Sequence, residues 1–267
     1  LDDFIEPAES ILTKAFSKLV AVDSRRWIKF LTDILPRFSC ELAASLSDFE
    51  KRMLQMFYIT VFQEAADWRS HTTQANMQLL ADSPIMMHEL NELLSFNLER
   101  IDFIDQPVPL GFDCPLDLHC TYTRDQILIA MDYMTPKNVR EGVKWLPDKQ
   151  VDVFFITLNK ADKDYSPTTM YNDYSINESL FHWQSQSRTS DTASTGQRYI
   201  NHRQRGSRVV LFVREFKQDS IGAAPYTCLG TAAYVKHTGS RPMNITWHLD
   251  QPIPAKYLRK TNKLVVG

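Results

Sequence analysis

Apolar residues recur at helical spacing through the first hundred residues of the chain. The stretches that show this stripe are residues 4–20, 24–35, 47–62 and 85–100. Pro36 ends the second stretch, and Ser47 with Glu50 gives the third stretch the signature of a capping box. This pattern predicts a helical bundle whose Met and aromatic side chains form the core.

The hydrophobic period changes after the segment 106–111 (QPVPLG), which interrupts the helical pattern. Thr123 and Gln126 then cap one short helix that runs to about Tyr133. Beyond Val143, short runs rich in β-branched and aromatic residues alternate with turn residues. The expected strands are residues 151–158, 180–184, 207–214, 226–234 and 243–249.

These patterns together predict an α+β protein of two domains. We expect a helical domain at residues 1–106 and a β-rich domain at residues 107–267. Several short strands with one or two helices favour a curved sheet or a small β-barrel for the second domain. The chain begins with Leu rather than Met, so we also expect it to be part of a longer protein.

Charge is divided unequally along the chain. Residues 1–148 hold 14 Lys and Arg against 23 Asp and Glu, whereas residues 149–267 hold 16 against 9, so a near-neutral total conceals a basic C-terminal half. A basic segment often faces a polyanion, and nucleic acid is the first candidate because Lys and Arg release counterions from phosphates. Two solvated surfaces that merely differ in charge are the alternative.

The motifs of common enzyme classes are absent from the sequence. There is no Gly-rich phosphate loop, no H-E-x-x-H and no G-x-S-x-G. Residues 159–164 (NKADKD) resemble a nuclease carboxylate–lysine pattern, but no matching E-x-K follows, and a solvated loop is the preferred interpretation. Asp113–Cys114 and His119–Cys120 offer too few soft ligands for a zinc site, so we expect free thiols, no metal and no cofactor.

Residues 165–205 interleave aromatic rings with Ser, Thr, Asn and Gln and end in an arginine cluster. Aromatic rings offer faces on which bases stack, and arginines hold phosphates. The alternative is that Phe181 and Trp183 are core residues of a strand, with His182 and Gln184 facing outward.

Several strings in this part of the chain resemble a known bacterial domain. They are YTRDQIL (122–128), YNDYSINESLFHWQSQS (171–187), TGQRYINH (195–202), VVLFVRE (209–215), APYTCLG (224–230) and GSRPMNITWHLDQPIPA (239–255). The chain resembles the C-terminal domain that follows a phospholipase D-like nuclease and a superfamily 2 helicase in modification-dependent (type IV) restriction enzymes of the SauUSI kind. The resemblance implies an SRA-like (PUA-like) domain that flips and reads 5-methylcytosine in DNA, and a helical coupler domain that links this recognition to the motor. It also implies upstream nuclease and helicase domains as partners, and a location in the bacterial cytoplasm.

Two sets of candidate site residues follow from the composition of this segment. The base-pocket candidates are Tyr171, Asp173, Tyr174, Phe181, Trp183 and Ser185, with Asp173 as an acceptor for cytosine N4. The DNA-backbone candidates are Arg188, Arg198, His202, Arg203, Arg205 and Arg208. We expect no catalytic residue in this chain, because ATPase and nuclease activities are expected upstream. The alternative function is a helicase-associated docking module that binds DNA only non-specifically. No apolar run reaches the length of a membrane span, so no membrane partner is expected.

Overall fold

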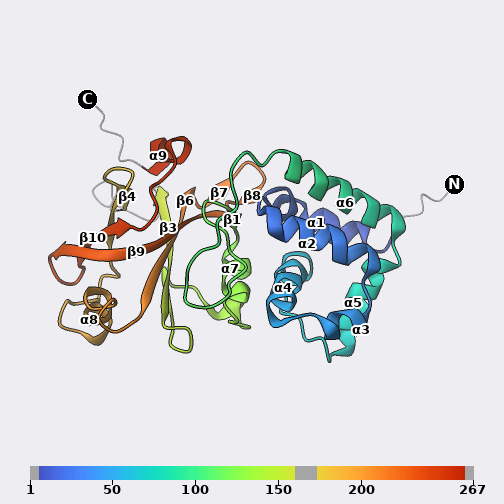
Figure 1. Cartoon of the computed structure of the whole chain (residues 1–267), viewed down its shortest axis with the longest axis horizontal. Helices are drawn as coiled ribbons and strands as arrows, with labels where there is room; N and C mark the ends of the chain where they lie inside the picture. Colours follow the sequence, from blue (N-terminus) through green and yellow to red (C-terminus); the bar gives the residue numbers. More distant parts are fainter. Residues whose placement is uncertain (1–5, 160–172, 262–267) are drawn as a thin grey trace. The chain divides into compact units, whose positions relative to one another are not determined.

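The structure is a computed structural model that describes residues 6–159 and 173–261 (Figure 1). The chain divides into two compact units. The helical unit comprises Leu1–Pro107 and Asp113–Val139, and the sheet unit comprises Val108–Phe112 and Arg140–Gly267. Residues 113–139 therefore belong with the helices, although the sequence analysis placed them in the second domain.

The helical unit contains seven α-helices among its described residues. They are α1 (Glu9–Val20), α2 (Arg25–Ile34), α3 (Cys40–Ser45), α4 (Asp48–Phe62), α5 (His71–Ala81), α6 (Pro84–Glu99) and α7 (Arg124–Ala130), with the 3-10 turns η1 (Leu35–Arg37) and η2 (Pro136–Asn138) and the short strand β1 (Thr121–Tyr122). The four helices predicted from the apolar stripes correspond to α1, α2, α4 and α6. The short helices α3 and α5 were not predicted.

Local capping residues fix where these helices begin. The capping box of Ser47 and Glu50 at the start of α4 is confirmed, because each side chain accepts a backbone N–H of the other residue. The box of Thr123 and Gln126 at the start of α7 is confirmed in the same way. Gln126 also donates from Nε2 to Thr60 Oγ1 at 2.8 Å, which ties α7 to α4 and explains why this segment joins the helical unit.

The sheet unit is built on one mixed sheet. Its strands are β2 (Val143–Leu146), β3 (Val151–Asn159), β4 (Tyr174–Ser175), β5 (Leu180–Gln184), β6 (Arg208–Phe216), β9 (Tyr226–Thr238) and β10 (Asn244–Leu249), in the order β2-β3-β6-β9-β10-β5-β4. The β3–β6 pair is parallel, and the other neighbours along this path are antiparallel. The short strands β7 (Gln218–Asp219) and β8 (Gly222–Ala223) form a separate hairpin.

The sheet is open, so the prediction of an α+β fold is confirmed but the small-barrel alternative is wrong. Among the described residues, β2 and β4 end the strand order without pairing with each other. The five predicted strands correspond to β3, β5, β6, β9 and β10. The register shifts in the β6–β9 pair and again in the β9–β10 pair, and such bulges bend and twist a strand locally without closing a barrel.

Two short helices complete the core on one face of this sheet. They are α8 (Ser194–Ile200) and α9 (Ala255–Thr261). Tyr199 of α8 is fully buried and makes an edge contact with Phe154 of β3, with ring centroids 5.5 Å apart, and Leu258 of α9 packs against the same cluster. A Cβ at Gly196 would lie 2.0 Å from the Ser190 carbonyl oxygen, so only glycine lets α8 approach the preceding loop this closely.

Candidate functional site

A cavity of about 370 Å³ lies in the sheet unit beside the turn that leads from α8 into β6. We call it the arginine pocket. It is lined by Pro109, His202, Arg203, Gly206, Ser207, Arg208, Thr231, Ala232 and Asp250. Three of the six residues predicted to contact a DNA backbone therefore lie around one cavity, and Arg205 is exposed in the same turn.

Arg208 is held at this pocket by the close approach of Gly111. Gly111 has a φ of +81°, and a Cβ there would lie 2.4 Å from Arg208 Nη1. The backbone of Arg208 donates to Gln150 O at 2.9 Å, which fixes the first residue of β6. A glycine at position 111 thus leaves space for the guanidinium group against the main chain.

Arg203 and Asp250 form a loose pair at the same pocket. Arg203 Nη2 lies 3.5 Å from Asp250 Oδ1, and the two side chains are 68% and 42% exposed. Thr231 Oγ1 donates to Asp250 Oδ2 at 2.6 Å, so the carboxylate is held by β9 rather than by the arginine. Because the ion pair is long and exposed, a phosphate can replace the carboxylate as the partner of Arg203 at little cost.

His202 lines the pocket but is a structural residue rather than a phosphate ligand. Its ring is buried, Nε2 accepts the Tyr234 backbone N–H at 3.1 Å, and Nδ1 lies 3.2 Å from Ser207 O. These contacts require a neutral ring that donates from Nδ1. Burial lowers the pKa of His202, which keeps the ring neutral.

Arg198 is not available to DNA either, which corrects the sequence-based assignment. Its Nε and Nη2 donate to the two oxygens of Asp152 at 2.8 and 2.9 Å, and the Asp152 side chain is completely buried. The guanidinium group also lies over the Trp145 ring, 4.5 Å from its centroid. Arg198 therefore joins α8 to β3, and no local pattern indicates this contact because Asp152 is 46 residues away.

The structure also corrects two of the base-pocket candidates. Phe181 is fully buried and Trp183 is 5% exposed, and the Trp183 ring packs on Phe154 with centroids 4.3 Å apart. Both belong to the main hydrophobic cluster of the sheet unit. The alternative interpretation, a strand whose apolar residues alternate toward the core, is therefore the one that the structure supports, since neither ring has a face to offer to a base.

Three of the remaining base-pocket candidates, Asp173, Tyr174 and Ser185, lie at the β4–β5 end of the sheet. Tyr174 is half-buried and stacks on His182, with ring centroids 4.7 Å apart and planes 15° from parallel. Asp173 accepts the Gln184 backbone N–H at 2.8 Å through Oδ1. Ser185 is buried and its Oγ accepts the Met243 N–H, so its role is structural. Tyr171, like residues 160–164 of the nuclease-like string, lies outside the described residues.

Arg188 lies on a separate, anchored loop and does not line the arginine pocket. Ser240 Oγ donates to Asp191 Oδ1 at 3.0 Å, and the Arg241 N–H donates to Thr189 O at 3.0 Å. These bonds tie the loop around exposed Arg188 to the tip of the β9–β10 hairpin. The six arginine and histidine candidates therefore separate into three at the pocket, one in the adjoining turn, one on this loop and one in the interior.

The sequence analysis missed Thr231 and Asp250. They come together because Thr231 lies within β9 and Asp250 directly follows β10, and the Asp250 N–H donates to Thr231 O at 3.0 Å. Nothing in the spacing of the two residues indicated this. The only available signal was a carboxylate at a strand end, where polar side chains of adjacent strands gather.

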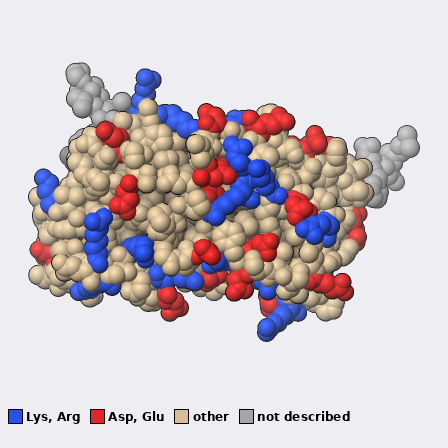
Figure 2. All heavy atoms as spheres, viewed as in Figure 1, with Lys and Arg blue, Asp and Glu red and all other residues tan. Residues whose placement is uncertain are grey.

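The unequal charge along the sequence follows the structural division. The helical unit holds 12 Lys and Arg against 21 Asp and Glu, and the sheet unit holds 18 against 11, which gives net charges of −9 and +7. On the face drawn in Figure 2, Lys and Arg are interspersed with acidic and uncharged residues rather than gathered in one continuous patch. On this face, the positive charge is therefore local rather than a uniform basic surface.

Three further features concern the cysteines, metal ligands and membrane-spanning helices. Burial raises the pKa of Cys114 to about 12, and its Sγ donates to Ala130 O, as expected for an inert thiol. Within residues 6–159 and 173–261, no three His, Cys, Asp or Glu side chains gather as a metal site would require. None of the helices in the described ranges combines the length and apolar character needed to cross a membrane.

Comparison with known families places this fold and its pocket in one of them. A search among curated proteins found no match. One family model matches residues 116–260, which is more than half of the chain and includes every residue of the arginine pocket except Pro109. The chain therefore belongs to the family described as a domain of unknown function, DUF3427.

Proposed function

We propose that the sheet unit binds double-stranded DNA through its phosphate backbone at the arginine pocket. The observation that carries this proposal is the convergence of Arg203 and Arg208 on one cavity, in a unit of net charge +7. Arg205, exposed in the same turn, adds a third cation. Guanidinium groups suit this role because they present paired donors to phosphate oxygens.

The contacts in the pocket allow its arginines to bind a phosphate without a change in the fold. Asp250 is held by Thr231 Oγ1 at 2.6 Å, whereas its contact with Arg203 is 3.5 Å long. Arg203 can therefore exchange the carboxylate for a phosphate while Asp250 keeps its place. Neutralising phosphates releases condensed counterions, which supplies sequence-independent affinity and makes the binding depend on salt.

A finer proposal is that the unit reads a modified cytosine. It rests on the resemblance to the recognition domain of modification-dependent restriction enzymes, in which an SRA-like domain flips 5-methylcytosine. With Phe181 and Trp183 in the core, Tyr174 is the candidate for the stacking ring, supported by its position on His182 at the sheet edge. Stacking on one such ring contributes roughly 1–3 kcal/mol per base. We propose a binding role, with any strand cleavage carried out by other domains.

The second candidate function is a docking module with only non-specific DNA contacts. The net charge of −9 on the helical unit favours it, because an acidic surface suits a basic protein partner rather than DNA. The two functions differ in one respect that can be measured. A reader distinguishes methylated from unmethylated DNA, whereas a docking module does not.

The experiment is a fluorescence anisotropy titration of the full chain with one duplex sequence in unmodified, 5-methylcytosine and 5-hydroxymethylcytosine forms. We expect Arg203→Ala, Arg205→Ala and Arg208→Ala each to weaken binding to all three duplexes by a similar factor. Lys217→Ala is the matched control, because it removes one exposed positive charge that does not line the pocket. Equal losses for the control and the three variants would refute a site at the pocket, and equal affinities for the three duplexes would favour the docking module.

A further inference from the structure

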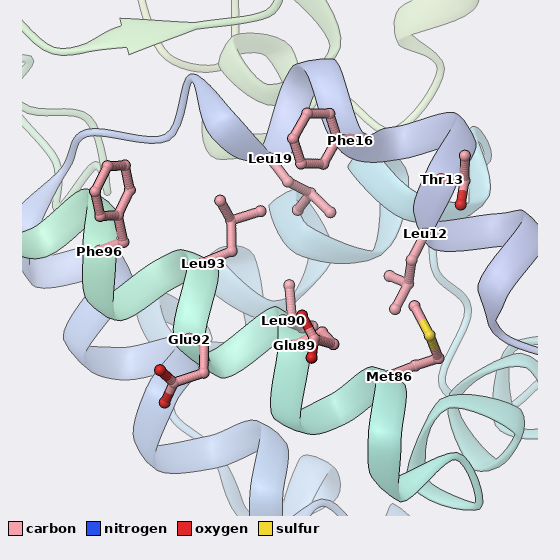
Figure 3. A pocket seen from close by; sticks show the side chains of 10 residues that line it. All are labelled: Leu12, Thr13, Phe16, Leu19, Met86, Glu89, Leu90, Glu92, Leu93 and Phe96. Atoms are coloured by element: carbon pink, nitrogen blue, oxygen red, sulfur yellow. The ribbon is translucent and has the colours of Figure 1, made fainter.

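The helical unit carries an apolar groove between α1 and α6 (Figure 3). Its volume is about 610 Å³, and it is lined by Leu12, Thr13, Phe16, Leu19, Met86, Glu89, Leu90, Glu92, Leu93 and Phe96. Leu12 and Leu19 extend from α1 toward Leu90 and Leu93 of α6, so the floor of the groove is formed by aliphatic side chains. The arginine pocket and the proposed DNA contacts use none of these residues.

Two aromatic rings of the groove are unusually exposed. Phe16 is 52% exposed and Phe96 is 53% exposed, one on each helix. Large apolar side chains that are exposed around a groove, rather than scattered singly, mark sites at which proteins bind one another. The aliphatic floor and the two rings together form the surface that an apolar helix face fits.

The polar part of the groove is acidic. Among the residues that the structure describes, Glu89 and Glu92 are the only charged ones that line the groove, and both are exposed. The helical unit as a whole has a net charge of −9. Arg100 lies over the Phe96 ring, 5.4 Å from its centroid, but does not line the groove. The negative charge of the groove therefore favours a basic occupant and disfavours nucleic acid.

We propose that the α1–α6 groove binds an amphipathic, basic α-helix of a partner protein. Apolar residues of that helix at positions i, i+3, i+4 and i+7 fill the groove between Phe16 and Phe96, and Lys or Arg on its flanks pair with Glu89 and Glu92. The lining residues run from Leu12 to Leu19 on α1 and from Met86 to Phe96 on α6, so about 12–16 Å of groove wall is available, enough for two to three helical turns. The inference is independent of DNA binding.

The test uses a fluorescein-labelled 18-residue peptide with Leu at helical spacing and Lys on the flanks, titrated with the full chain. We expect saturable binding that is lost when the same residues are scrambled and when Glu replaces Lys. Phe16→Ala and Phe96→Ala should each weaken it by about tenfold, as expected for ring anchors in a groove. Ile104→Ala is the control, because Ile104 is 91% exposed in the same unit but does not line the groove.

A second pair of variants tests the charge requirement without altering the apolar floor. Glu89→Gln together with Glu92→Gln should weaken binding about threefold to tenfold at low salt, and Glu99→Gln, on α6 but outside the groove, should not. Circular dichroism should show the same helix content for every variant. Failure of the basic peptide to bind, equal binding of the acidic peptide, or self-association of the chain through the groove would overturn the proposal.

Discussion

Arg198 donates two hydrogen bonds, of 2.8 and 2.9 Å, to the completely buried carboxylate of Asp152. This pair joins α8 to β3. The helix α8 leads directly into the turn that carries Arg203 and Arg205. Burial raises the pKa of Asp152, and the hydrogen bonds and charge of Arg198 oppose that effect. The residue that the sequence indicated as a DNA contact thus has a structural role, to join α8 to the sheet.

Removing this partner should destabilise the sheet unit. Arg198→Ala leaves the Asp152 carboxylate buried without its cation, which should lower the free energy of unfolding by about 3–5 kcal/mol. Urea denaturation followed by tryptophan fluorescence measures the loss. The double variant Arg198→Met, Asp152→Leu should recover much of it, because a buried pair can be replaced by apolar residues of similar volume. An Arg198→Ala variant as stable as the wild type would show that the pair contributes nothing.

The aromatic residues of β4 and β5 should separate into core and surface. Trp183→Ala should lower stability by about 3–5 kcal/mol whatever the DNA. Tyr174→Ala should leave the fold intact and, on the base-reading hypothesis, weaken binding to methylated DNA by roughly 1–3 kcal/mol. Thermal denaturation and DNA titration, performed on both variants, distinguish the two roles. A folded Tyr174→Ala variant that keeps full preference for methylated DNA would place the stacking ring elsewhere.

His202 should make the stability of the sheet unit depend on pH. Burial lowers its pKa in the folded chain below the ordinary value of 6.5. The unfolded chain therefore binds the proton more readily, so the stabilising contribution is present above about pH 6.5 and is lost as the pH falls through the folded-state pKa. Urea unfolding between pH 7.5 and 5 measures this slope. His202→Gln keeps a donor and an acceptor but does not titrate, so its slope should be smaller; an unchanged slope would refute the assignment.

Gly111→Ala should weaken DNA binding without removing any charge. The new Cβ would displace the Arg208 guanidinium, whose Nη1 lies 2.4 Å from that position. The positive φ of +81° should also cost about 1–2 kcal/mol of stability. Gly239→Ala is the control, because Gly239 has a φ of +70° but a Cβ there would lie nearest to Pro242 O and Asn244 Nδ2 rather than to an arginine of the pocket. We expect DNA titrations to show a loss for Gly111→Ala and none for Gly239→Ala, and no added loss in a Gly111→Ala, Arg208→Ala double variant.

Much of the fold could be predicted from the sequence because local patterns determine it. The capping residues Ser47 and Thr123 act within one helical turn. The apolar runs of β3 and β6, rich in β-branched and aromatic residues, are typical of buried strands. The helix α8 was missed because its seven residues carry no apolar stripe and it depends on Gly196 packing against Ser190. The stability of α8 therefore comes from tertiary packing, which a local sequence pattern does not reveal.

The candidate site was predicted only in part, for a related reason. Composition identified the arginines near residue 200, but it could not distinguish Arg198, whose partner Asp152 is on β3, from Arg203 and Arg208 at the pocket. Likewise, Phe181 and Trp183 have the residue types of a stacking site and the positions of a core strand. Whether these rings stack on a base or pack in the core depends on the neighbouring strands. Those neighbours are determined by pairing between strands that are distant in the sequence.

The salt dependence of DNA affinity tests the central proposal most directly. Dissociation constants for an unmodified duplex should be measured from roughly 50 to 200 mM salt for the wild type and for the triple variant Arg203→Ala, Arg205→Ala, Arg208→Ala. A logarithmic plot should be steep for the wild type, and its slope should fall by about 0.9 for each phosphate contact that is lost. Lys217→Ala removes an exposed charge outside the pocket, so it should leave the slope unchanged. An affinity that does not vary with salt, or a slope that the triple variant shares with the wild type, would contradict a phosphate-binding site at the arginine pocket.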